Sequence, residues 1–160
     1  MNKIILSLLF SLPAFGQDMP TIRLSKQIKA SNTTVIKVYG AELCNNQQGL
    51  SIVHNNKITP CFRLLSTFEK NDAKKIINLL HDSGSYTDGD TTCFKTDHAL
   101  LILENGVVTG YVNISFFCNK IISSPAIPAA SKLLSPKGKD ALLRTLKLVS
   151  EEPLVAPLEN

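Results

Sequence analysis

The segment CFKTDHALLILENGVVTGYVNISFFC, residues 93–118, has an Asn-Gly pair between two apolar runs and a cysteine at each end. Asn-Gly favours a type I′ turn, because both central residues of that turn need positive φ. The pattern predicts a β-hairpin that turns at Asn105-Gly106. Counting outward from this turn places Cys93 opposite Cys118, at a pair where Cα atoms lie about 4.5 Å apart. That separation is within reach of a disulfide bond.

Both faces of the predicted hairpin are mostly apolar, which indicates a position inside a sheet with a helix on one side. Side chains alternate between the two faces of a strand. In the register set by the turn, His98 lies on the face opposite Cys93 and Cys118. A β-bulge within residues 95–97 would turn His98 toward the cysteines. The cysteine face is expected to contain Leu101, Leu103, Val108, Val112, Ile114 and Phe116, and the other face Leu100, Ile102, Val107, Tyr111 and Phe117.

The first sixteen residues have the pattern of a secretory signal peptide. Lys3 precedes an apolar run over residues 4–15, and a small-x-small cleavage site ends at Gly16. The run is shorter than the roughly 20 residues that span a bilayer. We therefore expect residues 1–16 to be removed and the mature chain to be periplasmic or secreted, with no transmembrane segment.

Export affects the interpretation of the four cysteines, because oxidising compartments favour disulfides. With Cys93 paired to Cys118, elimination pairs Cys44 with Cys61. The alternative is a metal or thiol-redox site at Cys93, His98 and Cys118, a ligand set that suits zinc or copper. The compartment and the predicted register favour the disulfides, so we expect no metal and no cofactor.

The remaining elements complete an α+β domain over residues 17–152, followed by a loose tail at 153–160. Residues 32–43 are rich in β-branched side chains and predict a strand, and residues 50–65 predict a second hairpin. Ser66 to Glu69 matches a capping box, so a helix is expected over residues 67–82. A second helix should begin after Ser135. The class is α+β, with a single antiparallel sheet of about 4–5 strands and two helices.

The segment from Cys93 to Cys118 resembles a group of small exported proteins and lipoproteins, mainly from Bacteroidetes, that have no assigned function. The pattern of that group is Cys-Phe-x-Pro-Arg-His, two strands, and Ile-Cys-Phe-x-Cys. This chain departs from it at Thr96, Asp97 and Ser115, where proline, arginine and a cysteine are expected. The resemblance implies a small exported protein and no particular activity.

Charge and motifs exclude some functions. The formal net charge is +4, but the basic residues are scattered and no aromatic residues alternate with them, so no nucleic-acid partner is expected. No GxSxG or HExxH motif is present. Asp88-Gly89-Asp90 lacks the spacing of a calcium loop. We therefore favour a non-enzymatic binding or interaction module, with an unknown protein or cell-envelope component as its partner and no catalytic residues.

Overall fold

A computed structural model describes residues 20–44 and 49–148 of the chain. The predicted signal peptide at 1–16 and the predicted tail at 153–160 lie outside the described residues. Within the described part, no helix is both long and apolar enough to cross a membrane.

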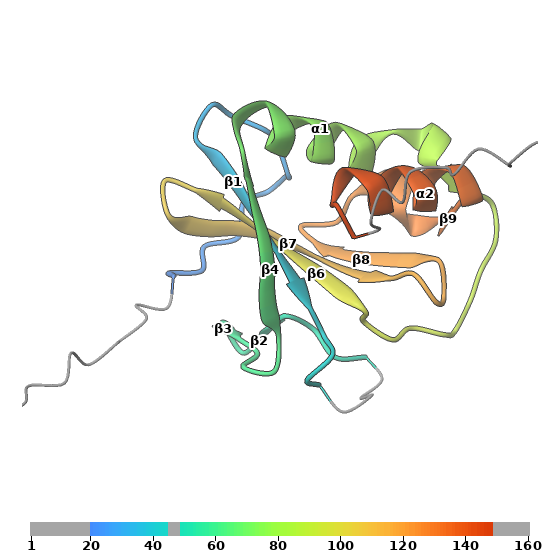
Figure 1. Cartoon of the computed structure of the whole chain (residues 1–160), viewed down its shortest axis with the longest axis horizontal. Helices are drawn as coiled ribbons and strands as arrows, with labels where there is room; N and C mark the ends of the chain where they lie inside the picture. The colour runs from blue at the N-terminus through green and yellow to red at the C-terminus, as the bar shows by residue number, and fades with distance from the viewer. Residues whose placement is uncertain (1–19, 45–48, 149–160) are drawn as a thin grey trace, which may run out of the picture.

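The main sheet has five strands in the order β4-β1-β6-β7-β8, and all neighbouring strands are antiparallel (Figure 1). Together with two helices, this sheet confirms the predicted α+β class. The second strand of the sheet, β1, falls inside the predicted strand at 32–43. The edge strand β8 was not predicted. The bounds are β1 (Thr34–Gly40), β4 (Arg63–Glu69), β6 (His98–Glu104), β7 (Val107–Ser115) and β8 (Lys120–Ser124).

Short elements complete the chain. The predicted second hairpin exists as β2 (Val53–His54) and β3 (Lys57–Ile58), and the two asparagines of its turn have φ of 49° and 56°. It is brief, because the chain leaves it to form β4 at the sheet edge. Two further short strands, β5 (Tyr86–Thr87) and β9 (Leu133–Leu134), pair with each other. The 3-10 helices are η1 (Ser83–Ser85) and η2 (Pro128–Ser131).

Helix α1 spans Lys70–His81 and buries Ala73, Ile76, Ile77 and Leu80, the apolar positions with helical spacing. The predicted capping box was wrong. The residues from Ser66 to Glu69 belong to β4 and pair with β1, and the Glu69 side chain makes no capping hydrogen bond. Strand pairing has therefore overridden a local helix-start signal.

Helix α2 spans Pro136–Thr145 and begins as predicted. The Ser135 hydroxyl accepts a hydrogen bond from the Gly138 amide at 3.0 Å, and Pro136 occupies the first turn, where a missing N–H has no cost. Leu142 and Leu146 are buried, which anchors the helix on the core.

The central hairpin turns where predicted, with φ of 50° at Asn105 and 80° at Gly106. Leu103 faces Val108 as expected, but the register then slips by one residue, and Ile102 faces Gly110. The bulge at residue 109 lies next to the turn and not within residues 95–97. A slip of one residue exchanges the faces of a strand. The predicted face assignments beyond the bulge were therefore wrong.

The sheet is covered on both faces. On one face, α1 and α2 pack against a core that includes Ile36, Leu100, Val112 and Ile114. On the other, the segment that contains Ile52 and Phe62 covers Leu101, Leu103 and Val108. The buried Asn113 side chain accepts a hydrogen bond from the Ile52 amide at 2.9 Å, which fixes that segment on the sheet.

Candidate functional site

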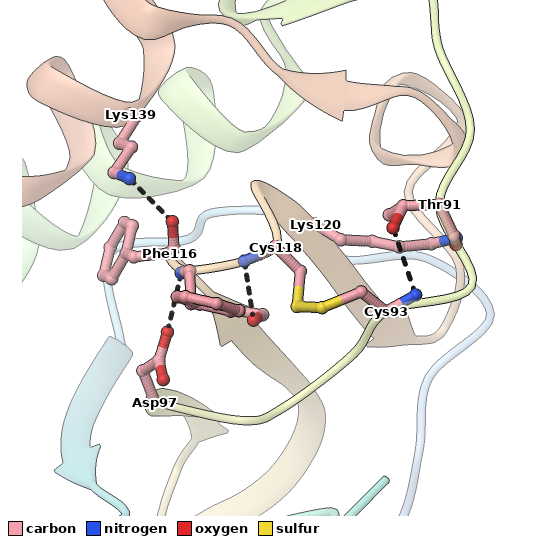
Figure 2. The surroundings of a disulfide bond; sticks show 9 residues. Thr91, Cys93, Asp97, Phe116, Cys118, Lys120 and Lys139 are labelled. Atoms are coloured by element: carbon pink, nitrogen blue, oxygen red, sulfur yellow. Dashed lines mark hydrogen bonds between the residues drawn. A yellow bond between two sulfur atoms is a disulfide. The ribbon is translucent and has the colours of Figure 1, made fainter. Parts of the chain in front are cut away.

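The four cysteines form the two predicted pairs, each with its sulfur atoms at bonding distance. The Cα atoms of Cys93 and Cys118 are 5.7 Å apart (Figure 2), and those of Cys44 and Cys61 are 5.0 Å apart. The position of the first pair differs from the prediction. Both Cys93 and Cys118 lie beyond the ends of β6 and β7, so they are not a ladder pair. Neither disulfide leaves a thiol for metal binding.

The turn from Phe116 to Cys118 is tied down from several directions (Figure 2). The Phe117 amide donates a hydrogen bond to the Asp97 carboxylate at 3.0 Å, and the Cys118 amide donates one to the Ser115 hydroxyl at 3.2 Å. The Lys139 ammonium, from α2, donates to the Phe116 carbonyl at 2.6 Å. The disulfide therefore belongs to a fixed corner that joins the end of β7 to α2.

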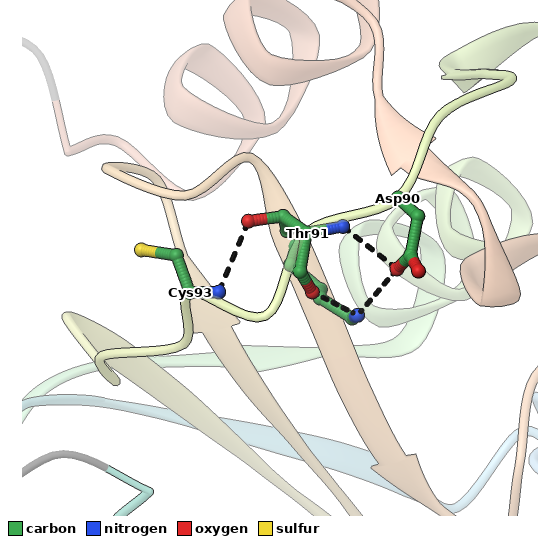
Figure 3. Close-up of polar contacts among 4 residues, drawn as sticks. Asp90, Thr91 and Cys93 are labelled. Atoms are coloured by element: carbon green, nitrogen blue, oxygen red, sulfur yellow. Dashed lines mark hydrogen bonds and ion pairs between the residues drawn. The ribbon is translucent and has the colours of Figure 1, made fainter.

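The loop before Cys93 is also occupied by protein contacts (Figure 3). The Thr91 hydroxyl accepts from the Cys93 amide at 3.0 Å, and the Asp90 carboxylate accepts from the Thr91 amide at 2.7 Å. Lys120 lies 3.6 Å from Asp90. Asp88 pairs with Lys132, whose hydrogen bond and charge lower the pKa of that carboxyl. The carboxylates of Asp88 and Asp90 are thus each paired with a lysine of the protein.

His98 does not join the cysteines in a ligand set. The bulge in β7 pairs His98 with Ile114, and the His98 ring lies 5.6 Å from that of Phe116, edge to face. In the part of the chain that the structure describes, no group of three His, Cys, Asp or Glu side chains could hold a metal ion. The structure brings Cys93 and Cys118 together and places the imidazole against an aromatic ring.

A groove of about 700 Å³ lies elsewhere, on the helix side of the molecule. We call it the lysine groove. Residues 26–30 form one wall, with Lys26 and Lys29, and α1 forms the opposite wall, with Lys74, Asn78 and His81. The third side consists of Ala126 and Pro128, which are apolar.

The lysine groove carries uncompensated positive charge. None of the described residues that line it is acidic. Among the described residues, Lys26, Lys29 and Lys74 have no ion-pair partner. The Glu104 carboxylate lies in an adjoining hollow that shares Gln27, Lys29 and Ala30 with the groove. Like charges near one another are unfavourable, so the groove is electrostatically suited to an anion.

The first wall of the groove is held in place by contacts from distant parts of the chain. The Thr21 carbonyl and the Arg23 amide bond to the Val108 backbone, and the buried Ile28 packs over Gly110. His81 Nε2 lies 3.0 Å from the Ile28 carbonyl, which links this wall to α1. The walls are therefore positioned by the sheet and by the helix, which favours a preformed site.

The Glu104 carboxylate stabilises the far end of the same segment. It accepts hydrogen bonds from the hydroxyls of Ser31, Thr33 and Thr34, the first at 2.5 Å. Partial burial opposes ionisation, but the three hydrogen bonds together lower the pKa of Glu104. A charged carboxylate thus ties the segment that follows the groove wall to the central hairpin.

No sequence motif indicates the lysine groove. Lys74 and Asn78 were recognisable as the outer face of a helix, but residues 26–30 carry no motif that would place them beside it. The available signal was the local composition alone. Lys26 and Lys29 have no acidic residue within two positions, and Lys74 has only Asp72. Only the fold brings these side chains together.

No family model, no curated protein and no solved structure matches this chain. The resemblance of residues 93–118 to exported Bacteroidetes proteins stays a prediction. The candidate site therefore rests on geometry and charge.

Proposed function

We propose that this chain is an exported, disulfide-held binding domain, without enzymatic activity, and that the lysine groove is its ligand surface. The observation that carries the proposal is the convergence of Lys26, Lys29 and Lys74 on one hollow with no acidic residue among its described lining. The volume of about 700 Å³ falls within the range of small-molecule sites.

The proposed export rests on the signal-peptide pattern at residues 1–16, and the two disulfides are compatible with it. Structural bridges stabilise small exported domains by constraining the unfolded chain, and loss of one typically costs about 2–5 kcal/mol. A binding role needs only a rigid surface, and the tethered walls of the lysine groove supply one.

The alternative, metal or thiol-redox chemistry at Cys93, His98 and Cys118, is less well supported. A metal site there would need both cysteines as thiolates, whereas they are bonded to each other. It would also need His98 to leave Phe116.

The test is mass spectrometry of the mature protein isolated from cells that export it. We expect reduction to add four hydrogen atoms, two for each bridge. The mass of the protein measured under native conditions should exceed its mass under denaturing conditions by the mass of a bound ligand. This difference should disappear in the double variant with Lys26→Met and Lys74→Met.

Lys75→Met is the control for a single charge on α1, because it removes an exposed ammonium that lies outside the groove and pairs with Asp72. It should keep the ligand. An equal ligand load in the wild type and in the double variant, zero included, would contradict the role of the groove. Free Cys93 and Cys118 with stoichiometric zinc or copper would instead establish the alternative.

A further inference from the structure

We infer that the lysine groove binds an amphiphilic anion, a carboxylate or phosphate group on a short hydrocarbon chain. This inference rests on the proposed function and specifies its ligand class. The groove is bipartite: two walls carry the lysines, and the third presents Ala126 and Pro128.

The charged walls set the requirement for an anionic headgroup. Lys26 and Lys74 line the hollow from two different elements, residues 26–30 and α1, so an anionic headgroup bound there lies in the field of both ammonium groups. Ammonium groups bind carboxylates and phosphates through short, charge-assisted hydrogen bonds. Gln27 and Asn78 add neutral hydrogen-bonding groups on the same two walls.

The third side of the groove, formed by Ala126 and Pro128, favours a ligand with an apolar part. Ala126 is exposed and Pro128 is exposed at the start of η2, and neither has a charged group. Ile28 and Ile77 also line the groove, but both side chains are buried in the helix-side core, so the exposed apolar residues of the lining are Ala126 and Pro128. A hydrocarbon chain covers these atoms and removes apolar surface from water, which a bare anion does not do.

The salt dependence of binding separates the two contributions. Raising ionic strength shortens the screening length from about 10 Å at 0.1 M to about 3 Å at 1 M. The headgroup contribution should weaken as salt increases, while the apolar contribution should not. An amphiphilic anion therefore loses affinity with salt but keeps more of it than a bare anion.

The experiment is an NMR titration of the full mature chain with four probes: octanoate, octyl phosphate, octanol and inorganic phosphate. Octanoate and octyl phosphate should shift the amides of residues 26–30 and of α1 around Lys74. We expect octanol and inorganic phosphate each to bind at least about tenfold more weakly. Comparing the two anionic amphiphiles distinguishes a carboxylate source from a phosphate source.

Variants locate the headgroup. Lys74→Met should weaken octanoate binding about fivefold, the scale of one exposed charge pair. Lys75→Met should leave the affinity unchanged, and both variants keep the fold because each replaced side chain is exposed. An equal loss in both variants would overturn the inference, because it would indicate attraction to net charge alone.

Three further results would also overturn it: octanol binding as tightly as octanoate, inorganic phosphate binding as tightly as octyl phosphate, or no shift with either amphiphile. If these occur while the isolated protein still retains a ligand that depends on Lys26 and Lys74, the ligand class is wrong and the proposed function stands. If that ligand is also missing, both proposals fail.

Discussion

At the scale of single residues, His98 is a group whose ionisation opposes folding. Its Nδ1 atom is buried and has no hydrogen-bond partner in the described part of the chain. Burial lowers the pKa of His98, and the negative charges of Asp97 and Glu42 only partly oppose that effect. The imidazole is thus held neutral against Phe116, and a protonated ring would lose solvation with no donor contact in return.

The first prediction concerns pH. Because the folded-state pKa of His98 lies below the unfolded value near 6.5, the unfolded chain takes up the proton first. The free energy of unfolding should be unaffected by His98 above pH about 6.5 and should fall as pH decreases below it. Urea denaturation between pH 7.5 and 5.5 measures this decrease.

A variant pair assigns the effect to His98. His98→Leu, which replaces the ring by an apolar side chain of similar volume, should flatten the dependence over this interval. His54→Leu is the control, because His54 is exposed beside the β2–β3 turn, and it should keep the wild-type dependence. An unchanged slope in His98→Leu would contradict the assignment.

At the scale of elements, α2 depends on one close contact. A Cβ atom on Gly138 would lie 2.0 Å from the Ser85 carbonyl oxygen, so a glycine lets the first turn of α2 lie directly on η1. The Ser135 amide also donates to that carbonyl at 3.0 Å, and the Ser135 hydroxyl does so at 3.1 Å. The start of the helix is therefore fixed by backbone contact.

The second prediction follows from this contact. Gly138→Ala should destabilise the protein by about 1–3 kcal/mol, the usual cost of overpacking, although alanine is the better helix former. Lys137→Ala, at the exposed neighbouring position, should change stability by about 0.5 kcal/mol or less. Equilibrium denaturation of both variants measures the difference. A Gly138→Ala variant as stable as the wild type would contradict the close packing.

The elements predicted from sequence are those set by local chemistry. The Asn105-Gly106 turn, the apolar stripe of α1 and the Ser135 cap were correct because neighbouring residues determine them. The capping box at Ser66 failed because pairing with β1 competes with it. The bulge at Thr109 and the strand β8 were missed because both depend on partners far along the chain.

The candidate site was predicted less well than the fold, for the same reason. The pairing of Cys93 with Cys118 could be derived because the hairpin links them. The environment of His98 could not, since the bulged residue in β7 decides which β7 side chains share its face of the sheet. The lysine groove joins residues 26–30 to α1 across the fold, and no local pattern encodes that approach.

At the scale of the whole molecule, the two disulfides join the loops at the ends of strands. Their loops span 17 and 25 residues, and constraint of the unfolded chain contributes about 3 kcal/mol for loops of this size. Cys44–Cys61 belongs to the core opposite the helices, whereas Cys93–Cys118 joins the corner that Lys139 ties to α2. Each bridge thus stabilises a different side of the sheet.

The third prediction is that these bridges open in a fixed order. Thiol–disulfide exchange needs access to a sulfur atom. Cys93 is exposed although its partner Cys118 is buried, whereas Cys44 is buried and Cys61 is only half-buried. Under limiting dithiothreitol in native buffer, alkylation and peptide mapping should therefore detect label first at Cys93 and Cys118. In denaturant, where burial no longer protects either pair, both should be labelled at similar rates. Earlier labelling of Cys44 and Cys61 in native buffer would contradict this prediction. Access to the sulfur atoms would then be controlled by local unfolding of the segment around Phe62, and not by exposure in the folded state.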